Sequence, residues 1–374
     1  MKILIAPDSF KESVSAADAA NAIQQGLAHS QLNGQYRCLP LADGGEGTVD
    51  ALTNALNGEI KTTQVRDPLG RLVTSHWGKV NDTAVIEMAS ASGLELLSEQ
   101  ERNPLITDSF GTGQLILDAL DHGVSKIILG LGGSATNDGG AGLMRALGAK
   151  LYDQYGNDIA PGGGSLAQLK SIDLQSVDRR LANVRFSLAC DVSNPLCGSN
   201  GASAIFGPQK GADKAMVELL DQNLKHFASV LQPYCDIDLL TVAGMGAAGG
   251  LSLGLELITK VERGSGFDLI SNAVELEKHI QWADLVITGE GKTDNQSLAG
   301  KACFGVANLA KSLNTPVLLI SGSLGKDYQQ LYQHGVVAAF SATLGPTTLQ
   351  NAIKNARQNL QQTALAIGNL LTLR

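Results

Sequence analysis

A glycine-rich stretch, residues 130–142, has the composition of a phosphate-binding loop. It joins an apolar, strand-like run at 126–129 to a helix-like run at 143–147. Glycines let the backbone approach a ligand closely and adopt positive φ. Backbone N–H groups clustered before a helix favour anions, because these donors lack partners and the helix dipole is positive at that end. The polar side chains that could contact a nucleotide or its metal are Ser134, Thr136, Asn137 and Asp138.

Two other interpretations of this stretch stay open. It could be a long turn in which Asn137 or Asp138 caps the following helix, a position that these residue types favour. Residues 130–135 also fit the Gly-x-Gly-x-x-Gly/Ala fingerprint of dinucleotide-binding proteins, with Asp153 near the position of a ribose-binding acid. The glycines continue well past that fingerprint, and no histidine is placed for hydride transfer. A nicotinamide-dependent dehydrogenase is therefore a minor alternative.

A second loop, residues 288–294, combines glycines with charged side chains. Its Gly-Lys-Thr triplet matches the end of a Walker A motif, but that motif requires glycine where this chain has Val286. The segment is therefore not a P-loop. A flexible loop that carries Glu290, Lys292 and Asp294 could still hold phosphate together with magnesium, because a hard cation prefers oxygen ligands and bridges to phosphate.

Further charged residues follow the predicted strands, at the carboxyl edge where open α/β sheets bind ligands. Asp191 stands where an apolar strand stops and Pro195 forces a turn. Its carboxylate could accept a proton from a hydroxyl nucleophile, or could simply cap a turn. Lys210 lies between glycines and is expected to be exposed and aimed at phosphate or carboxylate. The other charged candidates in such loops are Asp8, Lys11, Asp43 and Glu46.

Composition argues against several classes of protein. The formal net charge is −8 and no run of Lys or Arg appears, so a nucleic-acid or anionic-membrane surface is not expected. Five cysteines and six histidines are scattered without zinc-site spacing, which disfavours a zinc centre and Ser-His-Asp catalysis. No apolar run approaches the roughly 20 residues of a membrane span, and Met1-Lys2 leads directly into a strand. We therefore expect a cytoplasmic protein with reduced thiols.

Apolar strands alternate with helical stretches near both ends of the chain, which indicates a parallel sheet covered on both faces. Two strands from the front and three from the back give a five-stranded, flavodoxin-like count. The predicted strands are 2–6, 36–41, 283–290, 316–322 and 336–341.

These strands lead to a prediction for the whole chain. We expect an α/β fold in which residues 1–60 plus 278–374 form a flavodoxin-like, doubly wound domain. Residues 61–277 would form a second α/β domain inserted in the first, and small ligands commonly bind in the cleft between such domains. The inserted part contains a glycine run at 244–251, which could be a ligand loop or a tightly packed helix start.

Five segments carry the most specific pattern in the chain. They are residues 43–48 (DGGEGT), 132–140 (GGSATNDGG), 189–192 (ACDV), 206–211 (FGPQKG) and 288–294 (TGEGKTD). As a set they resemble the bacterial glycerate kinase family, in its type-1 group. The resemblance extends from the opening residues 5–11 (IAPDSFK) to near the C-terminus.

The resemblance implies an ATP- and magnesium-dependent kinase that phosphorylates D-glycerate. The implied product is 2-phosphoglycerate, in the breakdown of glycerate, glucarate or glyoxylate. Phosphorylation of the 3-hydroxyl is one alternative, and a non-catalytic protein that binds sugar acids or nucleotides is another. Neither nucleic acid nor a membrane is expected as a partner, and the sequence leaves open whether the chain forms homo-oligomers.

Phosphoryl transfer mainly requires positioning and charge neutralisation, and we assign roles on that basis. Asp191 would orient or deprotonate the attacking hydroxyl. The cations expected to offset the charge of glycerate and of the moving phosphoryl group are Lys11, Lys210 and Lys292. The residues expected to cradle ATP are Gly132, Gly133, Ser134, Thr136, Asn137 and Gly139. Direct or water-mediated magnesium contacts are expected from Asp43, Glu46, Glu290 and Asp294.

Overall fold

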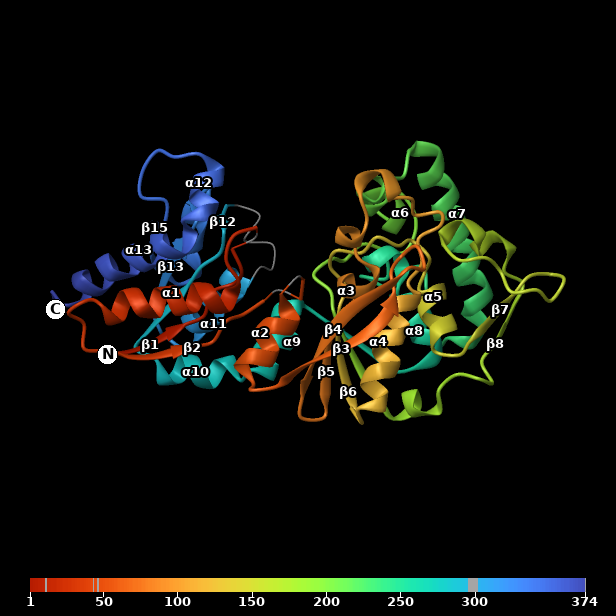
Figure 1. The fold of residues 1–374 in the computed structure, drawn as a ribbon, viewed down its shortest axis with the longest axis horizontal. Coiled ribbons are helices and arrows are strands. Elements are labelled where there is room, and N and C mark those ends of the chain that lie inside the picture. Colours follow the sequence, from red (N-terminus) through yellow and green to blue (C-terminus); the bar gives the residue numbers. More distant parts are fainter. Residues whose placement is uncertain (11, 43, 46, 295–301, 374) are drawn as a thin grey trace. The chain divides into compact units, whose positions relative to one another are not determined.

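The computed structural model describes residues 1–10, 12–42, 44–45, 47–294 and 302–373. The chain forms two compact units (Figure 1). The first unit consists of Met1–Asp43, Asp50–Asn57 and Phe267–Arg374, and the second consists of Gly44–Val49 and Gly58–Gly266. The domain boundaries expected from the sequence stay predictions.

A five-stranded parallel sheet forms the centre of the first unit. Its strand order is β15-β13-β11-β1-β2. Renumbered along the chain, this is the 2-1-3-4-5 order of flavodoxin-like folds, so the predicted fold class is confirmed. The strands are β1 (Lys2–Ile5), β2 (Gln35–Cys38), β11 (Leu285–Thr288), β13 (Val317–Ser321) and β15 (Val336–Ser341).

Helices cover both faces of this sheet because its strands are apolar on both faces. Ile3 and Ile5 pack with α1 and α13, whereas Leu4 and Val286 point to the opposite face, where α10 and α11 contact the sheet. Ser15 starts α1 by accepting a hydrogen bond from the Asp18 N–H at 3.1 Å. The helices are α1 (Ala16–Ala28), α2 (Thr48–Ala55), α9 (Gly266–Ala273), α10 (Leu276–Trp282), α11 (Ala302–Ser312), α12 (Leu349–Lys354) and α13 (Ala356–Leu371).

A six-stranded mixed sheet forms the centre of the second unit, with the order β10-β9-β6-β5-β4-β3. Strands β5, β6, β9 and β10 are parallel, while β3 and β4 form an antiparallel hairpin at one edge. The strands are β3 (Glu59–Arg66), β4 (Leu72–Val80), β5 (Thr83–Glu87), β6 (Lys126–Gly130), β9 (Arg185–Ala189) and β10 (Val261–Gly264).

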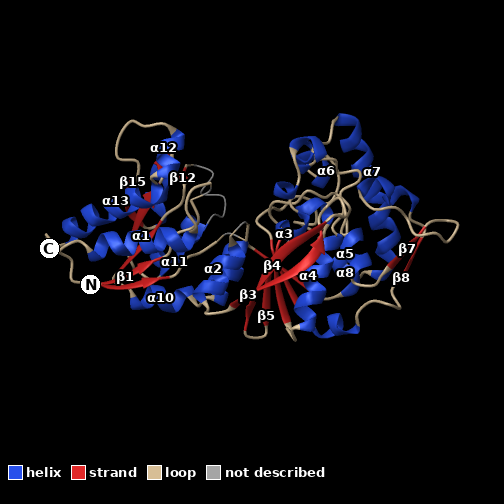
Figure 2. Cartoon of the chain, in the orientation of Figure 1, coloured by secondary structure: helices blue, strands red, loops and turns tan. Residues whose placement is uncertain are grey.

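Two hydrophobic clusters of described residues lie in the second unit. One joins Trp77 and Phe186 of the sheet to the helices α4 and α8. The other lies around Phe227 of α7, away from the main sheet. Figure 2 shows α4 and α8 near the red strands and α7 farther from them. The helices are α3 (Ala89–Ser92), α4 (Phe110–Asp121), α5 (Ala141–Ala146), α6 (Ala202–Phe206), α7 (Lys214–Leu231) and α8 (Ser252–Ile258).

Two small sheets lie outside the two main ones, and short 3-10 helices occur in the connecting segments. β7 (Lys150–Tyr152) pairs with β8 (Ser171–Asp173) in antiparallel fashion, and β12 (Lys292–Thr293) pairs in parallel with β14 (Ser323–Leu324). Among the described residues, no helix combines the length and apolar character that crossing a membrane requires.

Candidate functional site

The carboxyl edge of the parallel strands in the second unit brings several predicted motifs together. The strand register places Glu87 beside Gly130, Gly130 beside Ala189, and Ala189 beside Gly264. The glycine loop therefore leaves the sheet next to the segment that carries Asp191. This arrangement is the one in which open α/β sheets bind ligands.

Gly132 and Gly133 form the exposed tip of the glycine loop. Gly133 has φ +71°, a conformation that favours glycine. Gly44 and Gly45, from the 43–48 motif, lie against this part of the loop. A Cβ on Gly130 would lie 2.6 Å from the Gly44 carbonyl oxygen, and one on Gly132 would lie 3.1 Å from the Gly45 Cα. Two of the predicted motifs thus meet backbone to backbone.

The rest of the glycine loop is buried. Ser134, Thr136, Asn137 and Gly139 are all inside the protein. Gly139 donates its N–H to the Gly249 carbonyl oxygen at 3.0 Å, so this N–H is already committed within the protein. Only the tip of the loop therefore presents its backbone to solvent.

Lys210 supports the glycine loop from inside the protein. Its ammonium donates hydrogen bonds to Ser134 Oγ at 2.8 Å and to the Thr136 carbonyl oxygen at 2.6 Å. The residue is only 1% exposed, so the sequence-based expectation of an exposed cation is wrong. Burial lowers the pKa of Lys210 to about 7, although the negative charge of Asp138 partly opposes that shift.

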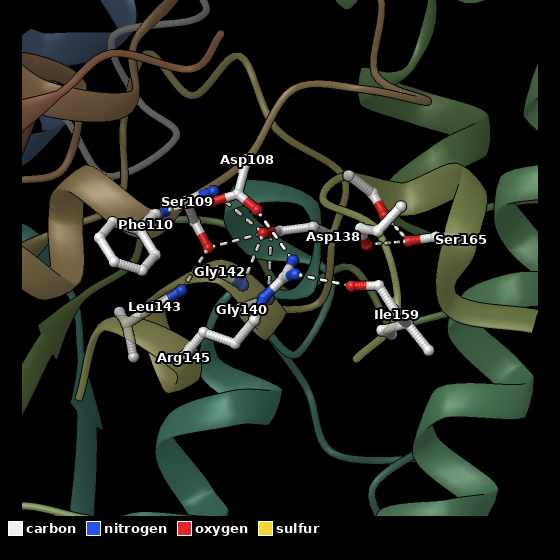
Figure 3. Close-up of polar contacts among 12 residues, drawn as sticks. Asp108, Ser109, Phe110, Asp138, Gly140, Gly142, Leu143, Arg145, Ile159 and Ser165 are labelled. Atoms are coloured by element: carbon white, nitrogen blue, oxygen red, sulfur yellow. Dashed lines mark hydrogen bonds and ion pairs between the residues drawn. The ribbon is translucent and has the colours of Figure 1, made fainter. Parts of the chain in front are cut away.

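Asp138 anchors the other half of the loop (Figure 3). Its carboxylate accepts hydrogen bonds from the Ser109 N–H and hydroxyl at 3.0 and 2.7 Å, and from the N–H groups of Gly140 and Gly142 at 3.2 and 3.1 Å. Asp138 therefore satisfies donors at the start of α5, although the N-cap position that the sequence left open for Asn137 or Asp138 is held by Gly140. Ser109 Oγ in turn accepts from the Leu143 N–H at 3.0 Å.

A second carboxylate lies close to Asp138. Asp108 forms an ion pair with Arg145, with 3.0 Å between Oδ2 and Nη2, and Arg145 also donates to the Ile159 carbonyl oxygen (Figure 3). Burial and the charge of Asp138 raise the pKa of Asp108 to about 6, against the opposing charge of Arg145. Our sequence reasoning missed Asp108, Ser109 and Arg145. An Asp-Ser pair before an apolar helix is the capping signal that could have identified the first two.

Two buried polar side chains in the loop lack a complete set of partners. Asn137 Nδ2 donates to Ser203 Oγ at 3.0 Å. Within the described part of the chain, neither Asn137 Oδ1 nor Thr136 Oγ1 has a hydrogen-bond partner. Buried polar atoms are normally paired with protein or water. These two atoms therefore have capacity for a donor that the protein does not supply.

Asp191 follows β9 and is exposed at the same sheet edge. Its Oδ1 accepts the N–H of Gly266, the first residue of α9, at 2.8 Å. Asp191 thus makes a capping contact and is an exposed residue. A residue that takes a proton from a substrate must be within the substrate's reach, and an exposed position at the sheet edge is compatible with that role.

Glu87 is a functional candidate that our sequence reasoning missed. It ends β5, next to Gly130 in the register. Its Oε1 accepts the N–H of Val49, near the start of α2, at 2.8 Å. The strand-end rule that selected Asp191 would have selected Glu87 as well.

The 288–294 motif lies in the first unit, at the carboxyl edge of that unit's own sheet. Glu290 is buried and accepts from Thr293 Oγ1 at 2.9 Å. Its negative charge and that of Asp8 add to burial in raising the pKa of the Cys303 thiol well above its usual range. Lys292 and Asp294 form an ion pair at 3.0 Å, in which the Lys292 side chain is 66% exposed.

Two of the predicted metal ligands, Asp43 and Glu46, lie outside the described residues. The same is true of Lys11, one of the predicted cations. Among the residues that are described, no group of three His, Cys, Asp or Glu side chains could hold a metal ion by itself. Mg²⁺ typically uses only one or two protein carboxylates, together with waters and substrate phosphates. The carboxylates of Glu290 and Asp294 are compatible with that mode.

Known proteins match this chain over nearly its full length in sequence and in structure. The model of the glycerate kinase family matches residues 3–372. A glycerate kinase of Bacillus subtilis (strain 168) is 49% identical over 375 residues, covering 100% of this chain and 98% of the relative. A glycerate 2-kinase of Escherichia coli (strain K12) has the same identity and coverage. A crystal structure described as a candidate glycerate kinase 2 from Salmonella typhimurium LT2 is 48% identical, with a TM-score of 0.91 and coverage of 100% and 98%.

Proposed function

Since this chain belongs to the glycerate kinase family and is therefore an enzyme, a kinase, we propose that it transfers the γ-phosphoryl group of ATP to the 2-hydroxyl of D-glycerate. The product would be 2-phosphoglycerate, formed in the breakdown of glycerate, glucarate or glyoxylate. The name of the Escherichia coli relative, glycerate 2-kinase, supports this choice of hydroxyl. The five free cysteines fit a reducing cytoplasm as the site of the reaction.

One observation carries the proposal: the glycine loop and Asp191 follow the neighbouring strands β6 and β9. We assign the exposed N–H groups of Gly132 and Gly133 to the phosphates of ATP. The buried members of the loop, Ser134, Thr136, Asn137 and Gly139, would maintain its shape. Preorganised backbone donors of this kind stabilise developing negative charge without reorganising during the reaction.

Asp191 is the proposed base. The glycerate hydroxyl oxygen forms a bond to the γ-phosphorus, and the bond from that phosphorus to the β–γ bridging oxygen breaks, releasing ADP. The hydroxyl proton passes to the Asp191 carboxylate. The exposure of Asp191 beside the glycine loop supports this role.

The charged residues outside this edge receive supporting roles. Magnesium, when bound with ATP, would neutralise phosphate charge, and the carboxylates proposed to hold it are Asp43, Glu46, Glu290 and Asp294. Lys11 and Lys292 would offset the charge of glycerate and of the transferred group. Lys210 would contribute its charge from inside the loop, because its ammonium already binds Ser134 and Thr136.

A coupled assay tests the function. ADP release should require D-glycerate, ATP and magnesium together. Release without glycerate, or binding of glycerate without turnover, would contradict the kinase proposal. Phosphorus NMR of the product should show 2-phosphoglycerate, and a 3-phosphoglycerate signal would overturn the proposed hydroxyl while leaving the kinase activity intact.

A further inference from the structure

The glycine run at 244–251, whose role the sequence left open, is a buried segment of the second unit. Residues 244–250 are all inside the protein, so the run is not an exposed ligand loop. Ala248 and Gly249 adopt successive left-handed conformations, with φ of +52° and +67°. Alanine rarely adopts such a conformation, and strained backbone of this kind persists only where the surrounding structure enforces it.

One end of the segment binds the glycine loop. The Gly139 N–H donates to the Gly249 carbonyl oxygen, and the Gly254 N–H donates to the Gly139 carbonyl oxygen, both at 3.0 Å. A Cβ on Gly249 would overlap the Thr136 carbonyl oxygen and would lie 2.6 Å from the Asn137 Cα. Only glycine therefore permits this backbone-to-backbone approach.

The other end of the segment contacts the residues that follow β9. The Gly246 N–H donates to the Asn194 carbonyl oxygen at 3.0 Å. A Cβ on Gly246 would overlap the Pro195 carbonyl oxygen, and one on Gly244 would lie 3.1 Å from the Val192 carbonyl oxygen. The same short run thus contacts both the glycine loop and the Asp191 segment.

We propose that residues 244–251 are a positioning element that fixes the glycine loop relative to Asp191. The inference rests on the proposed function, since it assumes that the loop binds phosphate and that Asp191 receives the proton. Gly249 acts on the loop through Thr136 and Asn137, whereas Gly246 acts on the Asp191 segment through Asn194 and Pro195. Neither glycine touches the substrates.

The first variant is Gly249→Ala, with Gly156→Ala as its matched control. Both glycines have positive φ, +67° and +83°, so both substitutions strain the backbone, but a Cβ on Gly156 meets no atom within 4 Å. Hydrogen exchange should become faster at the amides of residues 136–140 in Gly249→Ala only. The KM for ATP should rise up to about 100-fold, since displacement of a binding group by about 1 Å can cost that much.

The second variant, Gly246→Ala, gives the opposite kinetic result. It has an ordinary φ, and its Cβ would press on the backbone of Asn194, Pro195 and Ala202 rather than on the glycine loop. We expect kcat to fall about tenfold or more by misplacement of Asp191, while the KM for ATP stays within about twofold. A general loss of structure would not separate kcat from KM in this way. All assays are run well below the midpoint of thermal unfolding for each variant.

The outcomes distinguish this inference from the proposed function. Unchanged exchange at residues 136–140 in Gly249→Ala would overturn the positioning role while leaving the kinase proposal intact. Faster exchange with unchanged kinetics would show that movement of residues 136–140 does not reach the ATP-binding tip at Gly132 and Gly133, which would also overturn the positioning role. If Gly249→Ala does not fold, Gly250→Ala is the milder variant, because its Cβ would meet the flexible Leu196 side chain and lie 3.3 Å from the Gly139 Cα. It should also speed exchange at the Gly139 amide; unchanged exchange there would overturn the inference.

Discussion

At the residue scale, the charged side chains at the glycine loop fall into buried and exposed ones. Lys210 and Asp138 are buried and bind the loop itself, while Asp191 is exposed at the sheet edge. The sequence shows residue type and spacing but not burial. All three residues could therefore be identified from the sequence. Lys210, however, was expected to be exposed and is buried in the fold.

Asp191 gives the most direct test of the chemistry. Asp191→Asn keeps an oxygen that can accept the Gly266 N–H but cannot take a proton from the hydroxyl. We expect kcat to fall by about 10²–10⁴-fold, the usual cost of losing a general base, with ATP affinity retained. Steady-state kinetics and nucleotide binding measure the two quantities. Wild-type turnover in Asp191→Asn would remove Asp191 from the mechanism.

Asp138 gives a stability test at the same scale. In Asp138→Asn an amide N–H₂ replaces one carboxylate oxygen and faces the N–H donors of Ser109, Gly140 or Gly142. A buried mismatch of this kind costs about 1–3 kcal/mol in the free energy of unfolding, or more because the lost acceptor is charged. Denaturant unfolding measures the change. Asp153→Asn is the control, because Asp153 also accepts backbone N–H groups but lies at an exposed turn; an equal loss in both variants would contradict the structural role of Asp138.

At the element scale, the structure confirms the strands that are apolar throughout. β1, β11, β13 and β15 lie where continuous apolar runs predicted them. The hairpin β3–β4 was not predicted, because it lies at the sheet edge and mixes polar with apolar residues. The burial of β3 alternates, but its sequence shows no matching apolar period, because Ile60 lies on the exposed face while Lys61 and Thr63 share the other face with Val65.

The packing of α1 against α13 depends on one glycine. A Cβ on Gly26 would overlap the Gln361 carbonyl oxygen and lie 2.7 Å from the Ala364 Cβ. Gly26→Ala should therefore force the helices apart and lower the free energy of unfolding by about 1–3 kcal/mol, despite the better helix propensity of alanine. Thermal unfolding measures the loss. Gln25→Ala, at an exposed position of the same helix, should not destabilise; a Gly26→Ala protein as stable as this control would show that the helices do not need the close approach.

At the scale of the whole molecule, the chain order conceals which unit a motif belongs to. Gly44–Val49 belongs to the second unit, although the residues on both sides of it belong to the first. The physical cause is the close packing of Gly44 and Gly45 against Gly130 and Gly132. Such an approach between segments far apart in sequence leaves no periodic signal in either one. The sequence could therefore predict the motifs but not which sheet each one joins.

The stability of the whole protein should depend on pH through Lys210. Its pKa is about 7 when folded, well below the ordinary lysine value of about 10.5 that the unfolded chain shows. Between these values the unfolded state binds a proton that the folded state lacks. Stability therefore rises as pH increases above about 7, by at most about 1.4 kcal/mol per pH unit for one proton. Asp108 contributes in a separate pH range. Because folding raises its pKa to about 6, the folded state binds the extra proton there, and the free energy of unfolding falls as pH rises from about 4 to 6.

Lys210→Met isolates the Lys210 contribution because it removes the charge but keeps most of the side-chain volume. Denaturant unfolding between pH 7 and 9 gives the free energy of unfolding of both proteins. We expect it to rise less with pH in the variant than in the wild type. Cysteine titration affects both proteins equally and so cancels in the difference. Lys225 is an exposed lysine on α7, and Lys225→Met is the control. Its free energy of unfolding should rise with pH as steeply as that of the wild type. Parallel curves for Lys210→Met and the wild type would mean that the buried ammonium keeps its proton throughout this range, because its hydrogen bonds to Ser134 and Thr136 outweigh the loss of solvation.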